Sequence, residues 1–88
     1  MHFVYVLLSE IDKEFYIGLT KNIDERIKSH QSGSVDSTKQ RRPLKLIYYE
    51  FYCDEDDARG REIFLKSGSG HRFLEKQLKN YLGKNRGT

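Results

Sequence analysis

Three apolar segments separated by polar stretches predict β-strands along the chain. Residues 3–9 form a continuous apolar run rich in valine and leucine, which is typical of a buried strand. Residues 14–20 alternate, so this strand has two different faces. The short polar segment 10–13 between them predicts an antiparallel hairpin, and residues 44–52 predict a third strand. The alternation places Phe15, Ile17 and Leu19 on one face of the second strand and Tyr16, Gly18 and Thr20 on the other.

Capping residues delimit three predicted helices. Polar caps accept hydrogen bonds from the first free N–H groups of a helix, and glycine ends one because it adopts positive φ readily. Apolar residues recur at helical spacing between these signals, most clearly in the last segment. The predicted boundaries are Asn22 to about residue 31 with a stop at Gly33, Asp54 or Glu55 to about Lys66, and residues 70–82 with Ser69 as the cap and Gly83 at the end.

The order of these elements is β-β-α-β-α-α, which predicts an α+β fold with a small three-stranded antiparallel sheet flanked by helices. A chain of 88 residues suits one domain, here residues 1–83, followed by a basic C-terminal tail over residues 84–88. No apolar run approaches the roughly 20 residues that span a bilayer. The single cysteine, Cys53, excludes an internal disulfide, so we expect a cytoplasmic protein without membrane contact.

The charged residues are segregated along the chain. Four bases lie within residues 39–45 without an acid among them, and residues 66–88 contain six bases and one acid, whereas acids cluster over residues 54–57. Such segregation favours a face that binds a polyanion, and nucleic acid is the leading candidate. The alternative is a solvated surface with uneven charge.

Glu62 breaks the pattern of the second predicted helix. Ala58 and Leu65 mark the inward stripe of this helix, and Glu62 falls on the same stripe by its spacing. A carboxylate in that position is costly to desolvate unless a cation accompanies it. The residues alone leave three interpretations open: a buried ion pair with arginine or lysine, a carboxylate at the rim of the core, and a metal ligand.

Two other pairs of residues lie at the margin of the predicted core. Arg26 and His30 are four residues apart on the first helix, so their side chains are neighbours and are placed to meet a phosphate. Tyr5 and Tyr16 lie on adjacent strands, and a phenol, whose pKa is ordinarily near 10, would act as a base only beside cations such as Arg26 or Lys21. The alternatives are a surface arginine, a hydrogen-bonded histidine and tyrosines that only pack.

These residues follow one another in an order that resembles the GIY-YIG nuclease superfamily over nearly the full chain. The second motif of that family, Tyr16-Ile17-Gly18, is present in full, and Phe3-Val4-Tyr5 takes the place of the first. The set is most similar to the stand-alone bacterial branch related to the N-terminal nuclease domain of the excision-repair nuclease. The remaining matches are Arg26, His30, Arg42-Pro43, Glu62 and Lys66.

The resemblance implies a metal-dependent endonuclease that hydrolyses DNA phosphodiester bonds, with low sequence specificity or a preference for DNA structure, in repair or recombination. By resemblance, Glu62 holds one Mg²⁺ or Mn²⁺, Tyr5 or Tyr16 activates the attacking water, Arg26 contacts the scissile phosphate and His30 supports it. A protein partner could supply further specificity. The residues expected to bind the DNA backbone are Lys21, Lys39, Arg41, Arg42, Lys45, Lys66 and Arg72.

The chain departs from the family pattern in two places. Phe3 stands where the first motif has glycine, and the late asparagine of the family would fall near Phe73 or Leu74, with Asn80 the nearest asparagine. This absence favours an alternative function, a nucleic-acid-binding module of the same fold with little or no catalytic activity. A third interpretation is a toxin-like or structural protein that uses the strand around residues 48–52 as a partner edge.

Overall fold

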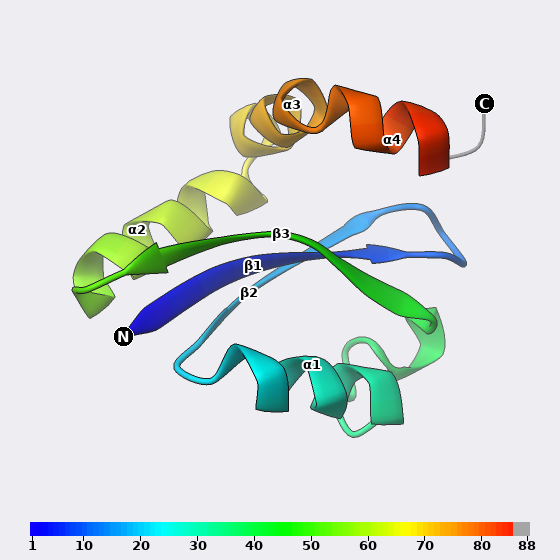
Figure 1. The fold of residues 1–88 in the computed structure, drawn as a ribbon, viewed down its shortest axis with the longest axis horizontal. Helices are drawn as coiled ribbons and strands as arrows, with labels where there is room; N and C mark the ends of the chain where they lie inside the picture. The colour runs from blue at the N-terminus through cyan, green and yellow to red at the C-terminus, as the bar shows by residue number, and fades with distance from the viewer. Residues whose placement is uncertain (86–88) are drawn as a thin grey trace.

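A computed structural model of the chain describes residues 1–85 and contains one three-stranded sheet. The strands are β1 (His2–Ser9), β2 (Phe15–Thr20) and β3 (Leu44–Tyr52), and both pairings are antiparallel in the order β2-β1-β3. The central strand β1 is therefore hydrogen-bonded on both sides, and β2 and β3 form the two edges (Figure 1). The predicted α+β class, the hairpin and the three strands are confirmed.

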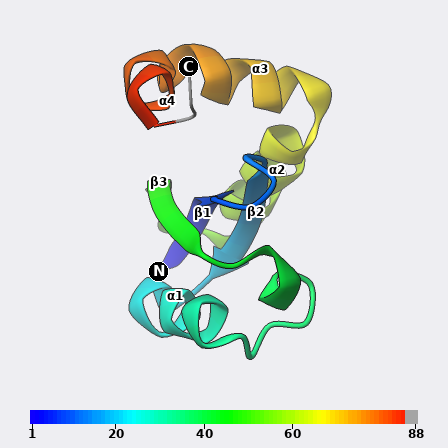
Figure 2. The same cartoon turned by 90° about the vertical axis from the view of Figure 1, so that its right-hand side faces the viewer.

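Helices cover both faces of this sheet. Helix α1 (Ile23–Ser32) lies on one side, and α2 (Glu55–Lys66), α3 (Gly68–Gln77) and α4 (Lys79–Asn85) lie on the other, as Figures 1 and 2 show. A short 3₁₀ helix (Lys39–Arg41) lies within the segment that connects α1 to β3. Within residues 1–85, no helix has the length and apolar character needed to cross a membrane.

The alternation of the strands divides the apolar side chains between two cores. One core lies under α1, where Tyr5 and Leu7 of β1 pack with Leu44 of β3. The larger core lies under the other three helices, and Ile23 and Ile27 of α1 do not belong to it. Its buried members are Val4, Val6, Leu8, Phe15, Ile17, Ala58, Leu65, Leu74 and Leu82.

The predicted caps of the first two helices are confirmed. The side chain of Asn22 accepts a hydrogen bond from the Glu25 backbone N–H at 3.1 Å, and Gly33 ends α1 with a φ of 84°. Asp54 caps α2 by accepting from the backbone N–H of Asp56 at 2.8 Å. These short-range signals could be predicted because each involves residues that are close in sequence.

The predicted third helix is wrong in its extent. It is two helices, because the backbone at Leu78 leaves the helical region (φ −107°, ψ 22°), and Ser67 rather than Ser69 caps α3. The bend lets the chain follow the sheet, so that Leu74 and Leu82 both reach the larger core. Lys84 and Asn85 belong to α4 and not to a tail, and residues 86–88 of the predicted tail lie outside the described residues.

A polar cluster around Glu50 fixes α2 to β3. The carboxylate of Glu50 accepts two hydrogen bonds from Arg61, at 2.8 and 2.9 Å. The hydroxyls of Tyr48 and Tyr52 donate to the same carboxylate at 2.5 and 2.8 Å. The Arg61 guanidinium also lies 4.6 Å from the centre of the Phe73 ring. Because a two-point arginine–carboxylate contact is directional, this cluster sets the rotation of α2 against the sheet.

The Glu50 cluster predicts a stability loss that depends on pH. Burial alone would raise the pKa of Glu50, but the hydrogen bonds from Arg61, Tyr48 and Tyr52 outweigh burial and hold this pKa below its ordinary value. Since the folded pKa is lowered, the contribution of the ionised carboxylate to stability is present above the unfolded value and is lost as pH falls. We expect Glu50→Gln to destabilise the protein by about 2 kcal/mol at pH 7 and by clearly less at pH 3.

Urea unfolding of both proteins at the two pH values measures this difference. Glu10→Gln, an exposed acid in the β1–β2 turn, serves as the control and should change stability little at either pH. A Glu50→Gln penalty that is equally large at pH 3 and pH 7 would contradict the prediction.

Candidate active site

The side chain of Tyr5 occupies space that Gly18 leaves open. The two residues are directly opposite each other in the β1–β2 pairing. A Cβ atom added at Gly18 would collide with the Cζ atom and the hydroxyl oxygen of Tyr5. The ring of Tyr5, which is 1% exposed, therefore lies across the edge strand because residue 18 has no side chain. The glycine of the second motif has this steric role.

A chain of buried hydrogen bonds extends from Tyr5 into α1 and the following loop. The Tyr5 hydroxyl lies 2.9 Å from Nε2 of His30, and Nδ1 of His30 lies 2.8 Å from the hydroxyl oxygen of Thr38. The Thr38 hydroxyl donates to the carbonyl of Val35, so its oxygen accepts from His30. His30 therefore carries its proton on Nδ1, and Nε2 accepts from the hydroxyl of Tyr5.

Burial keeps both partners in this chain neutral. Burial lowers the pKa of His30, and the charge of Arg26 lowers it further. Burial also raises the pKa of Tyr5; Tyr16 adds to this effect, Arg26 opposes it and Glu62 adds to it. Tyr5 thus keeps its proton at neutral pH and donates it in a hydrogen bond.

The prediction that the imidazole of His30 is placed to meet a phosphate is wrong. His30 is 0% exposed, and both ring nitrogens bond to protein groups. Sequence spacing located this residue on the correct side of α1, but it could not show that Thr38, eight residues later, closes over it. His30 contacts both motif tyrosines, through a hydrogen bond with Tyr5 and an edge-on ring contact with Tyr16.

Tyr16 lies beside this chain but is less buried. Its ring centre is 6.4 Å from that of Tyr5 and 5.0 Å from that of His30, and the latter contact is edge-on. The side chain is half-buried, and its hydroxyl makes no protein hydrogen bond within residues 1–85. Of the two motif tyrosines, Tyr16 is therefore the one whose hydroxyl is available to another molecule.

Arg26 is exposed on α1 and lines a depression of about 390 Å³. Its charge reaches the site, because it influences the pKa of both Tyr5 and His30. The depression lies between the start of α1 and the loop that follows this helix. Its other lining residues are Thr20, Asn22, Glu25, Ser29, Ser34 and Val35.

Glu62 approaches the same site from α2. Ala58 and Leu65 on this helix are fully buried, as predicted, while the side chain of Glu62 remains 16% exposed. Its charge raises the pKa of Tyr5, so it lies within electrostatic reach of that hydroxyl. Helices α1 and α2 cover opposite faces of the sheet (Figure 1), and the charges of Arg26 on α1 and Glu62 on α2 both act on the pKa of Tyr5.

The partner of Glu62 is Lys66, at 3.1 Å, one turn along α2. The lysine side chain is 55% exposed, so this ion pair is accessible to water and contributes less than about 1 kcal/mol. A lysine with this freedom can be displaced by a stronger cation. The structure therefore resolves part of the question left by the sequence: Glu62 is at the rim of the core, with a weak lysine partner.

The side chains around Glu62 determine whether a metal ion would fit here. Within residues 1–85, no group of three or more histidine, cysteine, aspartate or glutamate side chains is arranged to hold a metal ion. Glu62 is a single, partly exposed carboxylate. This suits Mg²⁺, which keeps several of its own waters and takes other oxygen ligands from a bound phosphate. The residues fit an ion that is shared with substrate.

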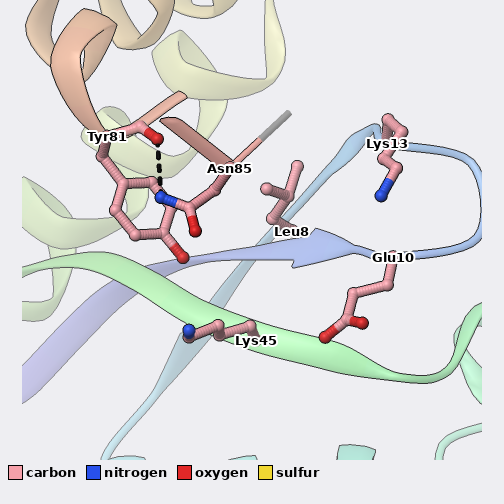
Figure 3. A pocket seen from close by; sticks show the side chains of 6 residues that line it. All are labelled: Leu8, Glu10, Lys13, Lys45, Tyr81 and Asn85. Carbon is pink, nitrogen blue, oxygen red and sulfur yellow. Dashed lines mark hydrogen bonds between the residues drawn. The ribbon is translucent and has the colours of Figure 1, made fainter. Parts of the chain in front are cut away.

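The structure brings only some of the predicted DNA-binding bases near the site. Lys66 contacts Glu62, and the charge of Lys21 reaches the start of α2 at Glu55. Lys45 lines a different depression with Glu10, Lys13 and Tyr81 at the far end of the hairpin (Figure 3). The other four bases have protein partners: Lys39 pairs with Asp36, Arg41 with Asp12, Arg42 with the carbonyls of Gln31 and Lys39, and Arg72 with Ser69.

Of these bases, Arg41 makes the most hydrogen bonds to the protein itself among the described residues. It binds Asp12 at 2.7 Å and donates to the carbonyls of Glu14 and Phe15, so it ties the β1–β2 turn to the loop before β3.

Phe73 and Leu74 stand near the place where the family pattern has its late asparagine. Both have structural roles here, because Leu74 is fully buried and the Phe73 ring packs against the Arg61 guanidinium. Neither residue offers a polar group to the site.

The buried hydrogen-bond chain predicts a specific effect of changing Thr38. Thr38→Val keeps the shape of the side chain but leaves the buried Nδ1–H of His30 without an acceptor, so we expect a loss of about 1–3 kcal/mol in the free energy of unfolding. Thr38→Ser keeps the hydroxyl and should lose clearly less. Denaturant unfolding measures both values, and equal losses for the two variants would refute the proposed proton arrangement.

Comparison with protein families and known proteins gives matches over most of the chain. A family model described as the GIY-YIG catalytic domain matches residues 1–86. The UPF0213 protein of Clostridium perfringens (strain 13 / Type A) is 39% identical over 76 residues, covering 85% of this chain and 81% of the relative.

Two other bacterial relatives are similar over comparable lengths. The UPF0213 protein of Staphylococcus haemolyticus (strain JCSC1435) is 35% identical, covering 84% of this chain and 90% of the relative. The UPF0213 protein of Pediococcus acidilactici is 36% identical, with shares of 89% and 82%. No solved structure gives a significant match. The family match and these relatives show that this chain belongs to the GIY-YIG family, a nuclease family whose members generally use divalent metal ions.

Proposed function

We propose that this protein is a metal-dependent endonuclease that hydrolyses phosphodiester bonds in DNA. The supporting observation is that Arg26, Glu62 and the neighbouring phenol of Tyr16 all influence the pKa of Tyr5. These four residues come from four different elements, β1, β2, α1 and α2. A guanidinium, a carboxylate and an accessible phenol around one edge of a sheet provide the groups that phosphodiester hydrolysis requires.

Glu62 is the residue that would hold the ion, Mg²⁺ or Mn²⁺. When bound, such an ion supplies a Lewis acid that polarises the phosphoryl oxygen and stabilises the leaving oxygen. Displacement of the exposed Lys66 side chain would free the carboxylate for this role. Lys66 would then be available to contact the DNA backbone.

The two phenols have different roles in this proposal. Tyr16, whose hydroxyl oxygen is available, acts as the phenolate: it loses its own proton to solvent beside the cationic groups of the site, then orients the attacking water and takes one proton from it. Tyr5 keeps its own proton because burial raises its pKa, and it holds the site in shape through its bond to His30. Arg26 donates to the scissile phosphate and stabilises the negative charge that grows there during attack.

The surface supports backbone binding more than base reading. Lys21, Lys66 and the exposed side chains of Lys39, Arg42 and Arg72 offer positive charge to phosphates, while Arg41 is held by its fold contacts. We propose that no element of the chain reads bases in a groove. We therefore propose low sequence specificity or a preference for DNA structure, in a cytoplasmic repair or recombination setting where a protein partner could add selectivity.

The test is cleavage of supercoiled plasmid and branched DNA with Mg²⁺, Mn²⁺ or chelator. The wild-type protein should cut with either metal and not with chelator. Glu62→Gln should reduce cleavage by roughly 10²–10³-fold, the loss typical of removing one electrostatic stabiliser of a transition state. Glu10→Gln removes the same charge at the far end of the hairpin and should cut at the wild-type rate (Figure 3).

The same assay separates the roles of the phenols. Tyr16→Phe should lose cleavage while its stability and DNA affinity stay close to wild type, because only the water-activating oxygen is removed. Tyr5→Phe should lose stability as well, since the buried Nε2 of His30 then has no donor. Equal cleavage by Tyr16→Phe and wild type would overturn the assignment of Tyr16.

The second candidate function is nucleic-acid binding without catalysis. It is favoured by one observation, that Phe73 and Leu74 provide no polar group where the family has asparagine. Wild-type protein that binds DNA in a salt-sensitive way but cuts no substrate with either metal would select this function over the nuclease.

A further inference from the structure

Three aromatic side chains form a surface cluster on the face of the sheet that carries Tyr5. Phe3 of β1 makes edge-on contacts with Tyr49 and Phe51 of β3, with ring centres 5.9 and 5.6 Å apart. Tyr49 is 54% exposed and Phe51 is 48% exposed. We call these three residues the aromatic platform.

The platform is continuous with the candidate active site. Tyr49 is directly opposite Tyr5 in the β1–β3 pairing, and Phe3 is two residues before Tyr5 on the same strand. On its other side Phe3 pairs with Thr20, which lines the same depression as Arg26. A strand of nucleic acid that leaves Arg26 across Thr20 would therefore reach Phe3 next.

Core packing does not explain the exposure of these rings. Helix α1 covers Leu7, Leu44 and Leu46 on this face, but neither Tyr49 nor Phe51 belongs to either core cluster. Adjacent exposed aromatic rings on a small protein mark a binding surface more often than a scattered apolar residue does.

We propose that the aromatic platform stacks unpaired bases of the DNA strand that enters the active site. The proposal rests on the proposed nuclease function, because the strand is the one whose phosphate Arg26 would contact. Aromatic side chains on an open sheet bind single-stranded nucleic acid in this way, since every base has a face that can stack regardless of sequence. Bases in an intact duplex are already stacked on one another and cannot occupy the platform.

The platform therefore specifies the substrate class. It selects DNA with a single-stranded segment next to the scissile phosphate, such as a flap, a gap or a splayed junction, over intact duplex. It adds no base preference, because stacking does not depend on the hydrogen-bonding edge. The feature that the platform recognises is the set of unpaired bases beside the scissile phosphate.

The chain offers a direct spectroscopic test because it contains no tryptophan. Phe51→Trp places a single tryptophan in the platform, and Ile11→Trp places one at an exposed position in the β1–β2 turn as a matched control. Both are made in a Glu62→Gln background and measured with chelator, so that cleavage does not interfere. The probes are a single-stranded oligonucleotide, an abasic oligonucleotide of equal length and the corresponding duplex.

The expected result is quenching of the tryptophan at residue 51 by the single-stranded oligonucleotide, with little quenching by the abasic or duplex probe. The tryptophan at residue 11 should respond weakly to all three. In parallel, Tyr49→Ala and Phe51→Ala should each weaken binding of the single-stranded probe by about tenfold, while Tyr49→Phe, which keeps the ring, should bind like wild type. Thermal unfolding of each variant establishes that these changes do not reflect loss of fold.

Several outcomes would overturn the platform. Equal quenching at residues 11 and 51, equal affinity for the abasic and normal probes, or unchanged affinity in both alanine variants would each do so. Unchanged affinity together with a shift from dimer to monomer in Phe51→Ala would assign the surface to a second copy of the chain.

Cleavage by the wild-type protein keeps this inference separate from the proposed nuclease function. If wild type cuts DNA but base-dependent quenching is absent, the stacking role of the platform is rejected and the nuclease function is retained. If quenching is base-dependent but no metal supports cleavage, the stacking role is retained and the nuclease function is rejected.

Discussion

The packing of Tyr5 across Gly18 is the contact on which the candidate site depends. It places a large ring over the edge strand β2, where any side chain at residue 18 would exclude it. The hydroxyl of that ring then binds His30, and His30 binds Thr38, so one buried chain joins β1, β2, α1 and the loop before β3. These groups are neutral and fully hydrogen-bonded, which makes the chain rigid without the cost of a buried charge. The rigid part of the site is thus separate from its charged and accessible groups.

A second constraint places the acid of the site. Glu62 follows Arg61 on α2, and Arg61 is held by two hydrogen bonds to Glu50 of β3. The two hydrogen bonds therefore restrain the rotation of α2 about its axis, and with it the position of Glu62, whose side chain is 16% exposed. The neutral chain holds Tyr5 in place, the Glu50 cluster holds α2, and the charge of Glu62 on α2 acts on the pKa of Tyr5. Arg26 is exposed, and Lys66, which pairs with Glu62, has a side chain that is 55% exposed.

Much of the fold could be predicted from sequence because its signals are local. The alternation in residues 14–20, the Asn22 and Asp54 caps and the Gly33 stop each involve residues close in sequence, and all are confirmed. The bend at Leu78 lies at neither a glycine nor a proline, so the sequence carried no local signal for it. It accompanies the packing of both Leu74 and Leu82 in the larger core. The same reason applies to the candidate site: spacing drew attention to Tyr5, Arg26 and Glu62, but it could not show the burial of His30, whose Nδ1 bonds to Thr38 eight residues later. The fold contacts of Arg41 join residues that are 26–29 positions apart, so periodicity could not reveal them.

In the proposed active site, Tyr16, Arg26 and Glu62 share one space that a metal ion and a phosphate can enter. Paramagnetic broadening by Mn²⁺, in the presence of a short DNA strand with a non-hydrolysable linkage, measures whether they do. We expect the backbone amide NMR signals of β2 near Tyr16, of α1 near Arg26 and of α2 near Glu62 to broaden together, and Glu62→Gln to abolish this effect. Broadening confined to the acidic residues 54–57 or to the depression beside Glu10, with the signals near Tyr16 and Arg26 unchanged, would contradict it.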